Sequence, residues 1–183
     1  METLKTSRLI LREWREGDAE DYLALAGDLE VSDYSGCERP VNAAAARDFI
    51  KQYLIPRECL AITLRGDGRA IGNIALLDTV YSRAFSCLKA REAAFSLIPS
   101  KWGRGIMSEA LAALLELSFA SLELDFVCCG CFVDNARSER LLGSFGFLPC
   151  FETQSPFVRS DGSVPVERLY LLTESAFLKR TQK

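Results

Sequence analysis

The spacing of hydrophobic residues alternates along the chain between the two-residue period of a strand and the longer period of a helix. Helical spacing follows the N-cap candidates Asp18, Asn42 and Asn135 and also follows Gly105. The elements come in the order β-α-α-β-β-β-α-β-α-β-β, which is typical of a mixed α/β (α+β) fold. The strand-like runs predict seven strands, at residues 8–14, 59–64, 70–77, 92–98, 126–133, 147–151 and 166–172.

Periodicity also predicts which side chains are buried. Tyr22, Leu25 and Leu29 share one face of the first helix, and the polar turn at residues 65–68 favours a β-hairpin. The helix after Gly105 is expected to place its apolar side against the core through Met107, Leu111, Leu114, Leu115, Phe119 and Leu122.

Size and charge narrow the class of protein. The chain has 183 residues, of which 49% are hydrophobic, so we expect a single domain over residues 1–183. The net charge is −3 and the pI is about 5.2, so the chain has no overall positive field that would attract the phosphate backbone of a nucleic acid. No apolar run approaches the ~20 residues of a membrane helix, and residues 1–14 do not resemble a secretory signal. We therefore expect a cytoplasmic protein with no membrane partner.

The cysteines do not indicate a metal site or a disulfide framework. The chain contains no histidine, and no pair of cysteines has CxxC spacing. We expect reduced cysteines that serve as small apolar core residues. They are Cys37, Cys59, Cys87, Cys128, Cys129, Cys131 and Cys150.

Residues 100–110, Ser-Lys-Trp-Gly-Arg-Gly-Ile-Met-Ser-Glu-Ala, form a glycine-containing turn between a strand and a helix. Gly103 and Gly105 allow backbone N–H groups to converge at the helix N-terminus, where a phosphate is favoured. The ordinary alternative is a turn that only reverses the chain. The segment lacks the Gly-Lys-Ser/Thr ending of a nucleoside-triphosphate loop and lies too late in the chain for a dinucleotide fingerprint.

A second segment, residues 133–147, begins after the next strand. Asn135 is suited to cap the following helix and Gly146 to end it. From these residues alone, Asn135 is equally well explained as a helix cap and as a site residue.

Taken together, these segments resemble the GNAT acetyltransferases. The resemblance rests on a strand, Trp-Gly-Arg-Gly-Ile-Met-Ser-Glu-Ala at 102–110, a second strand, Asp-Asn-Ala-Arg-Ser at 134–138, and Gly-Phe at 146–147. Residues 6–12 and 167–173 look closest to the ribosomal-protein N-acetyltransferase (RimJ/RimL-like) branch. The resemblance thus covers nearly the whole chain.

The resemblance implies a twisted, mixed sheet of about seven strands flanked by helices, with acetyl-CoA as cosubstrate and no metal. The fourth and fifth strands, residues 92–98 and 125–133, would splay apart around the coenzyme. The basic residues around the two helix starts, where they could contact the phosphates of CoA, are Lys101, Arg104, Arg137 and Arg140, and Arg104 is the best placed of them. Pantetheine would pair with the backbone of Phe95, Ser96, Leu97 and Ile98, and pyrophosphate would meet Trp102, Gly103, Arg104, Gly105, Ile106, Met107 and Ser108.

The resemblance also suggests catalytic residues. Glu92 matches a common position for the general base, although an exposed charge at a strand end is the simpler interpretation. Asn135 and Ser138 match positions near the thioester. Leu142 stands where many GNAT enzymes have a tyrosine, and leucine has no proton to donate. Ser138 is then the best available donor to the leaving thiolate, unless it is only a cap partner.

We therefore expect transfer of an acetyl group from acetyl-CoA to a primary amine, such as a protein N-terminal amine. Two alternatives stay open, a small-molecule acceptor such as a polyamine or aminoglycoside, and a non-catalytic module that binds acyl-CoA. Asp33, Tyr34 and Glu38 lie in the region expected to face the acceptor but form no recognition motif. A monomer and a homodimer are both compatible with the sequence.

Overall fold

The computed structural model describes residues 2–35, 39–79 and 88–181. The chain divides into two compact units, and each unit is made of two segments. Unit 1 consists of Met1–Leu76 and Phe95–Leu114, and unit 2 of Leu77–Ala94 and Leu115–Lys183.

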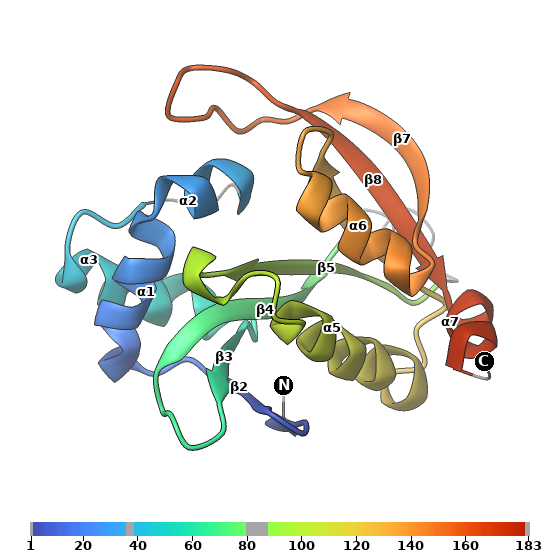
Figure 1. Ribbon diagram of the computed structural model, residues 1–183, viewed down its shortest axis with the longest axis horizontal. Helices are drawn as coiled ribbons and strands as arrows, with labels where there is room; N and C mark the ends of the chain where they lie inside the picture. Colours follow the sequence, from blue (N-terminus) through green and yellow to red (C-terminus); the bar gives the residue numbers. More distant parts are fainter. Residues whose placement is uncertain (1, 36–38, 80–87, 182–183) are drawn as a thin grey trace. The chain divides into compact units, whose positions relative to one another are not determined.

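Eight strands form a mixed sheet in the order β1-β2-β3-β4-β5-β6-β8-β7 (Figure 1). The predicted fold is confirmed, with one strand beyond the predicted seven because the two-residue strand β1 pairs with β2. Strands β5 and β6 are parallel, whereas β6 and β8 are antiparallel. The strands are β1 (Leu4–Lys5), β2 (Leu9–Glu13), β3 (Leu60–Leu64), β4 (Ala70–Asp78), β5 (Ala90–Leu97), β6 (Phe126–Phe132), β7 (Leu148–Gln154) and β8 (Val166–Thr173).

Unit 1 is built on an antiparallel arrangement of β2, β3 and the first part of β4. The predicted hairpin is present, and Gly66 in its turn has a φ of +83°. Alternate residues of β2, Leu9 and Leu11, are fully buried, as expected when one face of a strand packs on the core.

Three helices precede β3 in unit 1. They are α1 (Ala19–Gly27), α2 (Leu29–Ser35) and α3 (Ala43–Phe49), and α3 continues into a π-helical turn over Ile50–Leu54. Asn42 caps α3 as predicted, because its Oδ1 accepts a hydrogen bond from the Ala45 N–H at 2.9 Å.

Two details of the first helix differ from the prediction. Asp18 is the N-cap residue of α1, as predicted, but its carboxylate makes no capping hydrogen bond. Instead it accepts two hydrogen bonds from the Arg12 guanidinium, at 2.7 and 2.8 Å, because a buried arginine needs a carboxylate partner. Leu29 is 50% exposed because α1 ends at Gly27 and Leu29 begins the separate helix α2.

Helix α5 (Ile106–Glu116) begins after Gly105, as predicted, and continues into a π-helical turn over Leu117–Ser121. This wider turn changes the angular spacing of the side chains, so Leu122 leaves the apolar face and is 42% exposed, contrary to the prediction. The predicted side chains that are buried are Leu111, Leu114, Leu115 and Phe119.

Unit 2 contains β6, β8 and β7, with helix α6 (Ala136–Phe145) between β6 and β7. Gly146 ends α6 in the left-handed conformation, as predicted for a C-cap. Helix α7 (Glu174–Thr181) was not predicted, since its short sequence carries only a few apolar residues. The ring of Phe177 lies 5.2 Å from that of Phe119, which anchors α7.

Among the described cysteines, none is in a disulfide. Cys59, Cys128, Cys129 and Cys131 are buried, in agreement with the prediction, but Cys150 is exposed. Cys150 lies at a β-bulge of strand β7, whose residues are all exposed. Cys37 and Cys87 are outside the described residues.

The described residues contain no group of three or more potential metal ligands. No helix among them is both long and apolar enough to span a bilayer.

Candidate functional site

The glycine-containing turn lies in unit 1, between β5 and α5. A 3-10 turn over Pro99–Lys101 leads out of the strand. Gly103 and Gly105 each have a φ of +70°, which residues with a Cβ rarely adopt. Nothing lies within 4 Å of a Cβ built on Gly103, so the backbone conformation and not lack of space requires glycine there.

The turn presents backbone donors at the start of α5. The Gly105 carbonyl accepts the first helical hydrogen bond, from the Glu109 N–H at 3.0 Å. The N–H groups of residues 106–108 therefore have no hydrogen-bond acceptor within the helix. Such groups at a helix N-terminus attract anions. Ile106 is buried, while Met107 and Ser108 are half-buried and Arg104 is exposed. This geometry suits a phosphate cradle.

Trp102 supports this turn through its side chain. The indole N–H donates to the Leu97 carbonyl at 2.7 Å, and the Trp102 backbone N–H donates to the Pro99 carbonyl at 3.1 Å. The side chain therefore ties the turn to the end of β5. A contact between Trp102 and pyrophosphate stays a prediction.

Other groups near the end of β5 are used within unit 1. The Ser96 hydroxyl donates to Asn73 Oδ1 at 3.0 Å, and the Ile98 N–H donates to the Ile71 carbonyl at 2.9 Å. Phe95 is half-buried and Leu97 is buried. If residues 95–98 contact a coenzyme, the contacts would therefore come mainly from their backbone groups other than the Ile98 N–H.

Glu109, in the first turn of α5, is surrounded by donors from the N-terminal segment. Its carboxylate accepts hydrogen bonds from the hydroxyls of Thr6 and Ser7 and from the backbone N–H and Nε of Arg8. Burial alone raises the pKa of Glu109, but these hydrogen bonds outweigh it and lower the pKa to about 2. Sequence reasoning missed this role, since a glutamate near a helix start is common.

Strands β5 and β6 pair over a short stretch in unit 2. Ala90, Arg91 and Glu92 pair with Phe126, Val127 and Cys128, and no later pair joins the two strands in the described part of the chain. Both strands nevertheless continue, β5 to Leu97 and β6 to Phe132. Within unit 2, Ala93 and Ala94 follow the last of these pairs, and the splay of the two strands around a coenzyme stays a prediction.

Glu92 lies at the last of these pairs. It is the third residue of β5 and is half-buried, so it is not an exposed charge at a strand end. Burial raises the pKa of Glu92, and the carboxylate of Glu167 raises it further. A carboxylate in this state is more basic than an exposed one, which suits a group that accepts a proton near neutral pH.

Glu167, on β8, is a further candidate that sequence reasoning missed. Burial raises the pKa of its carboxyl. A Cβ on Gly130 would lie only 1.9 Å from Glu167 Oε1, so the glycine makes room for this carboxylate beside β6. The closeness of the two glutamates follows from strand pairing and has no local signal in the sequence.

Asn135 is the N-cap of α6, as predicted. Its Oδ1 accepts a hydrogen bond from the Ser138 N–H at 3.1 Å. The cap occupies one lone pair of Oδ1, so a direct contact with a substrate could come from its second lone pair, from the Nδ2 amide or from the backbone. The cap interpretation is confirmed, and a role at the thioester stays a prediction.

Ser138 has a protein partner for its hydroxyl. Burial raises the pKa of Cys131, and a hydrogen bond from the Ser138 side chain opposes this shift. Both residues are in unit 2, Cys131 on β6 and Ser138 in the first turn of α6. Leu142, one turn later, is fully buried and serves the core.

The turn before α6 is held by an arginine that sequence reasoning missed. Arg159, from the loop after β7, donates to both carboxylate oxygens of Asp134, each at 2.7 Å. Its guanidinium also lies 5.2 Å from the centre of the Phe132 ring. These contacts fix the residue that directly precedes Asn135.

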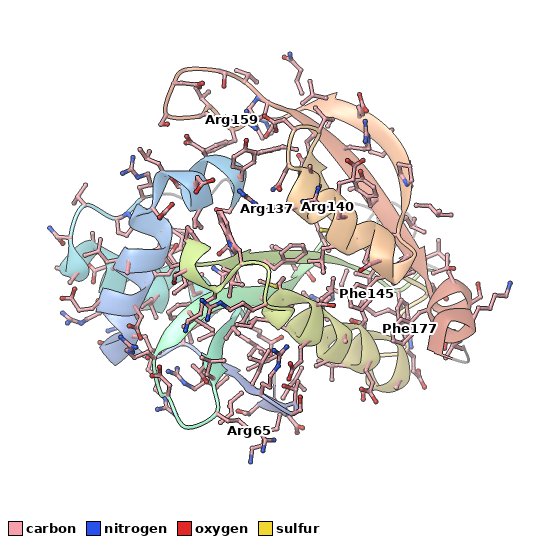
Figure 2. All side chains as sticks on the ribbon, in the orientation of Figure 1. Arg65, Arg137, Arg140, Phe145, Arg159 and Phe177 are labelled. Atoms are coloured by element: carbon pink, nitrogen blue, oxygen red, sulfur yellow. The ribbon has the colours of Figure 1, made fainter. Side chains whose placement is uncertain are left out.

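The predicted basic residues of α6 are at the surface. Arg137 and Arg140 are exposed and extend from α6 (Figure 2). Asp33 and Tyr34, on α2 in unit 1, are half-buried, and Glu38 is outside the described residues. None of these positions identifies an acceptor.

Comparison with known proteins decides the family. The sequence pattern of the "Acetyltransferase (GNAT) domain" matches residues 8–148, which is more than half of the chain. The chain belongs to the GNAT acetyltransferase family. It is 29% identical over 148 residues to the uncharacterized N-acetyltransferase YoaA of Bacillus subtilis (strain 168). The aligned region covers 79% of this chain and 81% of YoaA.

Solved GNAT structures share the fold at lower sequence identity. A GNAT-family acetyltransferase from Bacillus anthracis superposes with a TM-score of 0.80 at 19% identity and covers 95% of this chain and 99% of its own. RimJ of Mycobacterium smegmatis, solved in complex with CoA-disulfide, has a TM-score of 0.75 at 18% identity. The superposition covers 95% of this chain and 88% of the RimJ chain.

Proposed function

We propose that this GNAT protein transfers an acetyl group from acetyl-CoA to a primary amine. The observation that carries the proposal is the turn in unit 1, where Gly103 and Gly105 adopt left-handed conformations and lead into the donors of α5. This arrangement fits a pyrophosphate, because the donors are backbone groups that need no reorganisation on binding. The family pattern at residues 8–148 includes residues of both units, so we propose that the chain acts as one domain.

The coenzyme contacts follow from this assignment. Residues 102–108 are assigned to the pyrophosphate, and Arg104 and Arg137 are assigned to the charge of the phosphates. The backbone of β5 from Phe95 to Leu97, together with Ile98 just beyond the strand, is assigned to pantetheine, whose amides suit backbone groups that lack a strand partner. The proposal needs no metal.

Glu92 is assigned as the group that accepts the proton of the amine. The amine attacks only when neutral, and its nitrogen forms a bond to the acetyl carbon as the bond from that carbon to sulfur breaks. The proton lost from nitrogen goes to the Glu92 carboxylate, directly or through water. Backbone N–H groups of β5 can stabilise the negative oxygen that develops meanwhile.

Asn135 and Ser138 are assigned to the leaving side of the reaction. Ser138 can donate a hydrogen bond to the departing thiolate, which becomes more negative as the bond breaks. Leu142 cannot take this role because it is apolar and buried. The hydrogen bond between Ser138 and Cys131 would hold the hydroxyl in place between turnovers.

A protein N-terminal amine is the acceptor to test first. Residues 6–12 and 167–173 resemble the ribosomal-protein branch, and the fold is similar to that of RimJ. An α-amine has a pKa of about 8, against about 10.4 for a lysine side chain, so it needs less help from a base such as Glu92. Polyamines and aminoglycosides are the competing acceptors.

The test is acetyl transfer by the full chain to three acceptors. A peptide with a free N-terminus is compared with the same peptide blocked at its N-terminus and with a polyamine. Products are identified by mass spectrometry, because the exposed Cys150 would react with a thiol dye. Transfer to the free peptide alone supports an N-terminal acetyltransferase, and transfer to the polyamine alone supports the small-molecule alternative. CoA binding without any transfer would make the protein a binding module, and no CoA binding would refute the proposal.

A further inference from the structure

The Arg8 side chain holds the turn of residues 103–105 from the side of the N-terminal segment. Its guanidinium donates to the carbonyl oxygens of Arg104 and Gly105, at 3.0 and 3.2 Å, and its Nε donates to Glu109 Oε2 at 2.6 Å. Arginine can serve these partners at once because its five N–H groups point in fixed directions from one plane. All of these residues belong to unit 1.

These contacts fix the directions in which the turn presents its donors. The described peptide bonds are all trans, so the C=O and the following N–H of each peptide unit point in opposite directions. The carbonyl of Arg104 faces Arg8, and the N–H of Gly105 therefore faces away from it. By the same geometry the N–H of Ile106 faces away, because the carbonyl of Gly105 also bonds to Arg8. Two consecutive donors are thus aimed to the other side of the turn.

Glu109 in turn holds Arg8. Besides Nε, the carboxylate accepts the Arg8 backbone N–H at 2.8 Å and the Ser7 hydroxyl at 3.0 Å. The Glu109 side chain is 16% exposed and that of Arg8 is 50% exposed, so the contact is partly shielded from water. The two residues are 101 positions apart in the sequence, which makes their contact a tertiary link between the N-terminal segment and α5.

We propose that Arg8 and Glu109 are positioning residues that preset the backbone donors of residues 105 and 106 for the CoA pyrophosphate. The inference rests on the proposed function. Without Arg8, glycine would let the turn sample other conformations, because Gly103 and Gly105 have few steric restrictions. Binding would then have to order the turn, which lowers affinity. Loss of Arg8 should therefore lower the affinity for ligands that contain a pyrophosphate and leave the affinity for other ligands unchanged.

The decisive variant is Arg8→Lys, which keeps the charge but replaces a planar fork with a single ammonium. Kd is measured by calorimetry for CoA and for pantetheine, which lacks the pyrophosphate and the nucleotide. We expect Arg8→Lys to weaken CoA binding by about tenfold, equivalent to the loss of one strong contact, and to leave pantetheine binding unchanged. Kinetics should agree, with kcat/KM reduced for acetyl-CoA and unchanged for S-acetylpantetheine.

Two further variants separate positioning from folding. Arg47→Lys, at an exposed position on α3, is the matched control and should change neither Kd. Glu109→Gln keeps the size of the side chain but weakens its hold on Arg8, so it should show the same selective loss. Circular dichroism at the assay temperature then excludes unfolding as the cause.

The outcomes separate this inference from the proposed function. If the wild type binds CoA and Arg8→Lys binds it equally well, only the inference is wrong. Equal losses for CoA and pantetheine would also overturn it, since they indicate general damage to the fold. A wild type that binds no CoA would refute the proposed function and the inference together.

Discussion

Glu92 on β5 and Glu167 on β8 lie on the same face of the sheet in unit 2. Glu92 pairs with Cys128 and Glu167 pairs with Phe132, and these two partners are four residues apart on β6. Side chains of a strand alternate in direction, so residues separated by an even number share a face. Neither glutamate forms a salt bridge with the residues that the structure describes. Their mutual repulsion raises the pKa of Glu92 beyond the effect of burial.

Glu92→Gln should lower kcat and stabilise the fold at the same time. As the base it contributes about 10²-fold or more to the rate. Its pKa is raised in the folded state, so ionised Glu92 costs stability. Below the pKa of Glu92 in the unfolded chain, near 4.5, Glu92→Gln should not change the free energy of unfolding. The stability gained by the substitution should grow as the pH rises toward the folded-state pKa and stay constant above it. Melting curves and turnover from pH 4 to 9 test this, and a variant with full turnover would remove Glu92 from the mechanism.

Glu167→Gln should shift the pH dependence of acetyl transfer. Removal of the neighbouring charge lowers the pKa of Glu92, so the rise in kcat/KM with pH should move to lower pH. The rate at high pH should change little, because Glu92 is retained. Glu152→Gln is a suitable control, since Glu152 is exposed and paired with Arg168. An unshifted profile would mean that Glu92 is not the titrating base.

Asn135→Ala can be compared with a matched cap variant, Asn42→Ala. Each asparagine caps a helix through Oδ1, which accepts from the Ser138 N–H at 3.1 Å and from the Ala45 N–H at 2.9 Å. Each substitution should therefore cost about 1 kcal/mol of stability. Only Asn135→Ala should also lower acetyl transfer, measured together with denaturant unfolding. If both variants lose stability and keep full turnover, Asn135 is a cap and nothing more.

Glu109→Gln should reduce stability at neutral pH but not in acid. The carboxylate has a pKa of about 2 in the folded state and 4.5 as its ordinary value, so its stabilisation is complete above pH 4.5. This contribution is lost as the pH falls toward 2. The wild type and Glu109→Gln should thus differ most in urea unfolding at pH 7 and converge at low pH. A constant difference across this range would contradict the lowered pKa.

The elements were predictable where the signal is local. The caps Asn42 and Asn135 and the left-handed Gly146 were found because each depends on residues within one turn. At Asp18 the N-cap position was predictable but the partner of the carboxylate was not, because this group had two possible partners, the N–H groups of α1 and the guanidinium of Arg12. Sequence spacing does not show which of the two is closer in the folded chain.

The candidate site was predictable only in part, for the same reason. Gly103 and Gly105 could be found because glycines between a strand and a helix indicate an unusual backbone. The contact of Arg8 with Glu109 and the repulsion between Glu92 and Glu167 join distant parts of the sequence. They arise from strand order and helix docking, which one sequence does not specify residue by residue.

Ser138 and its neighbours offer the sharpest test of the leaving-group assignment. Ser138→Ala should lower kcat and leave CoA affinity unchanged, because the hydrogen bond to sulfur strengthens only as charge develops. Leu142→Ala should instead reduce stability by about 2–5 kcal/mol, since it opens a cavity in the core. A purely structural role for Ser138 is tested by Cys131→Ala, which removes the partner of its hydroxyl. If Cys131→Ala lowers kcat as much as Ser138→Ala does, Ser138 acts by holding β6 against α6. If Cys131→Ala keeps kcat while Ser138→Ala lowers it, the hydroxyl itself serves the thiolate. Full turnover by Ser138→Ala, with chemistry rate-limiting, would assign this task to water.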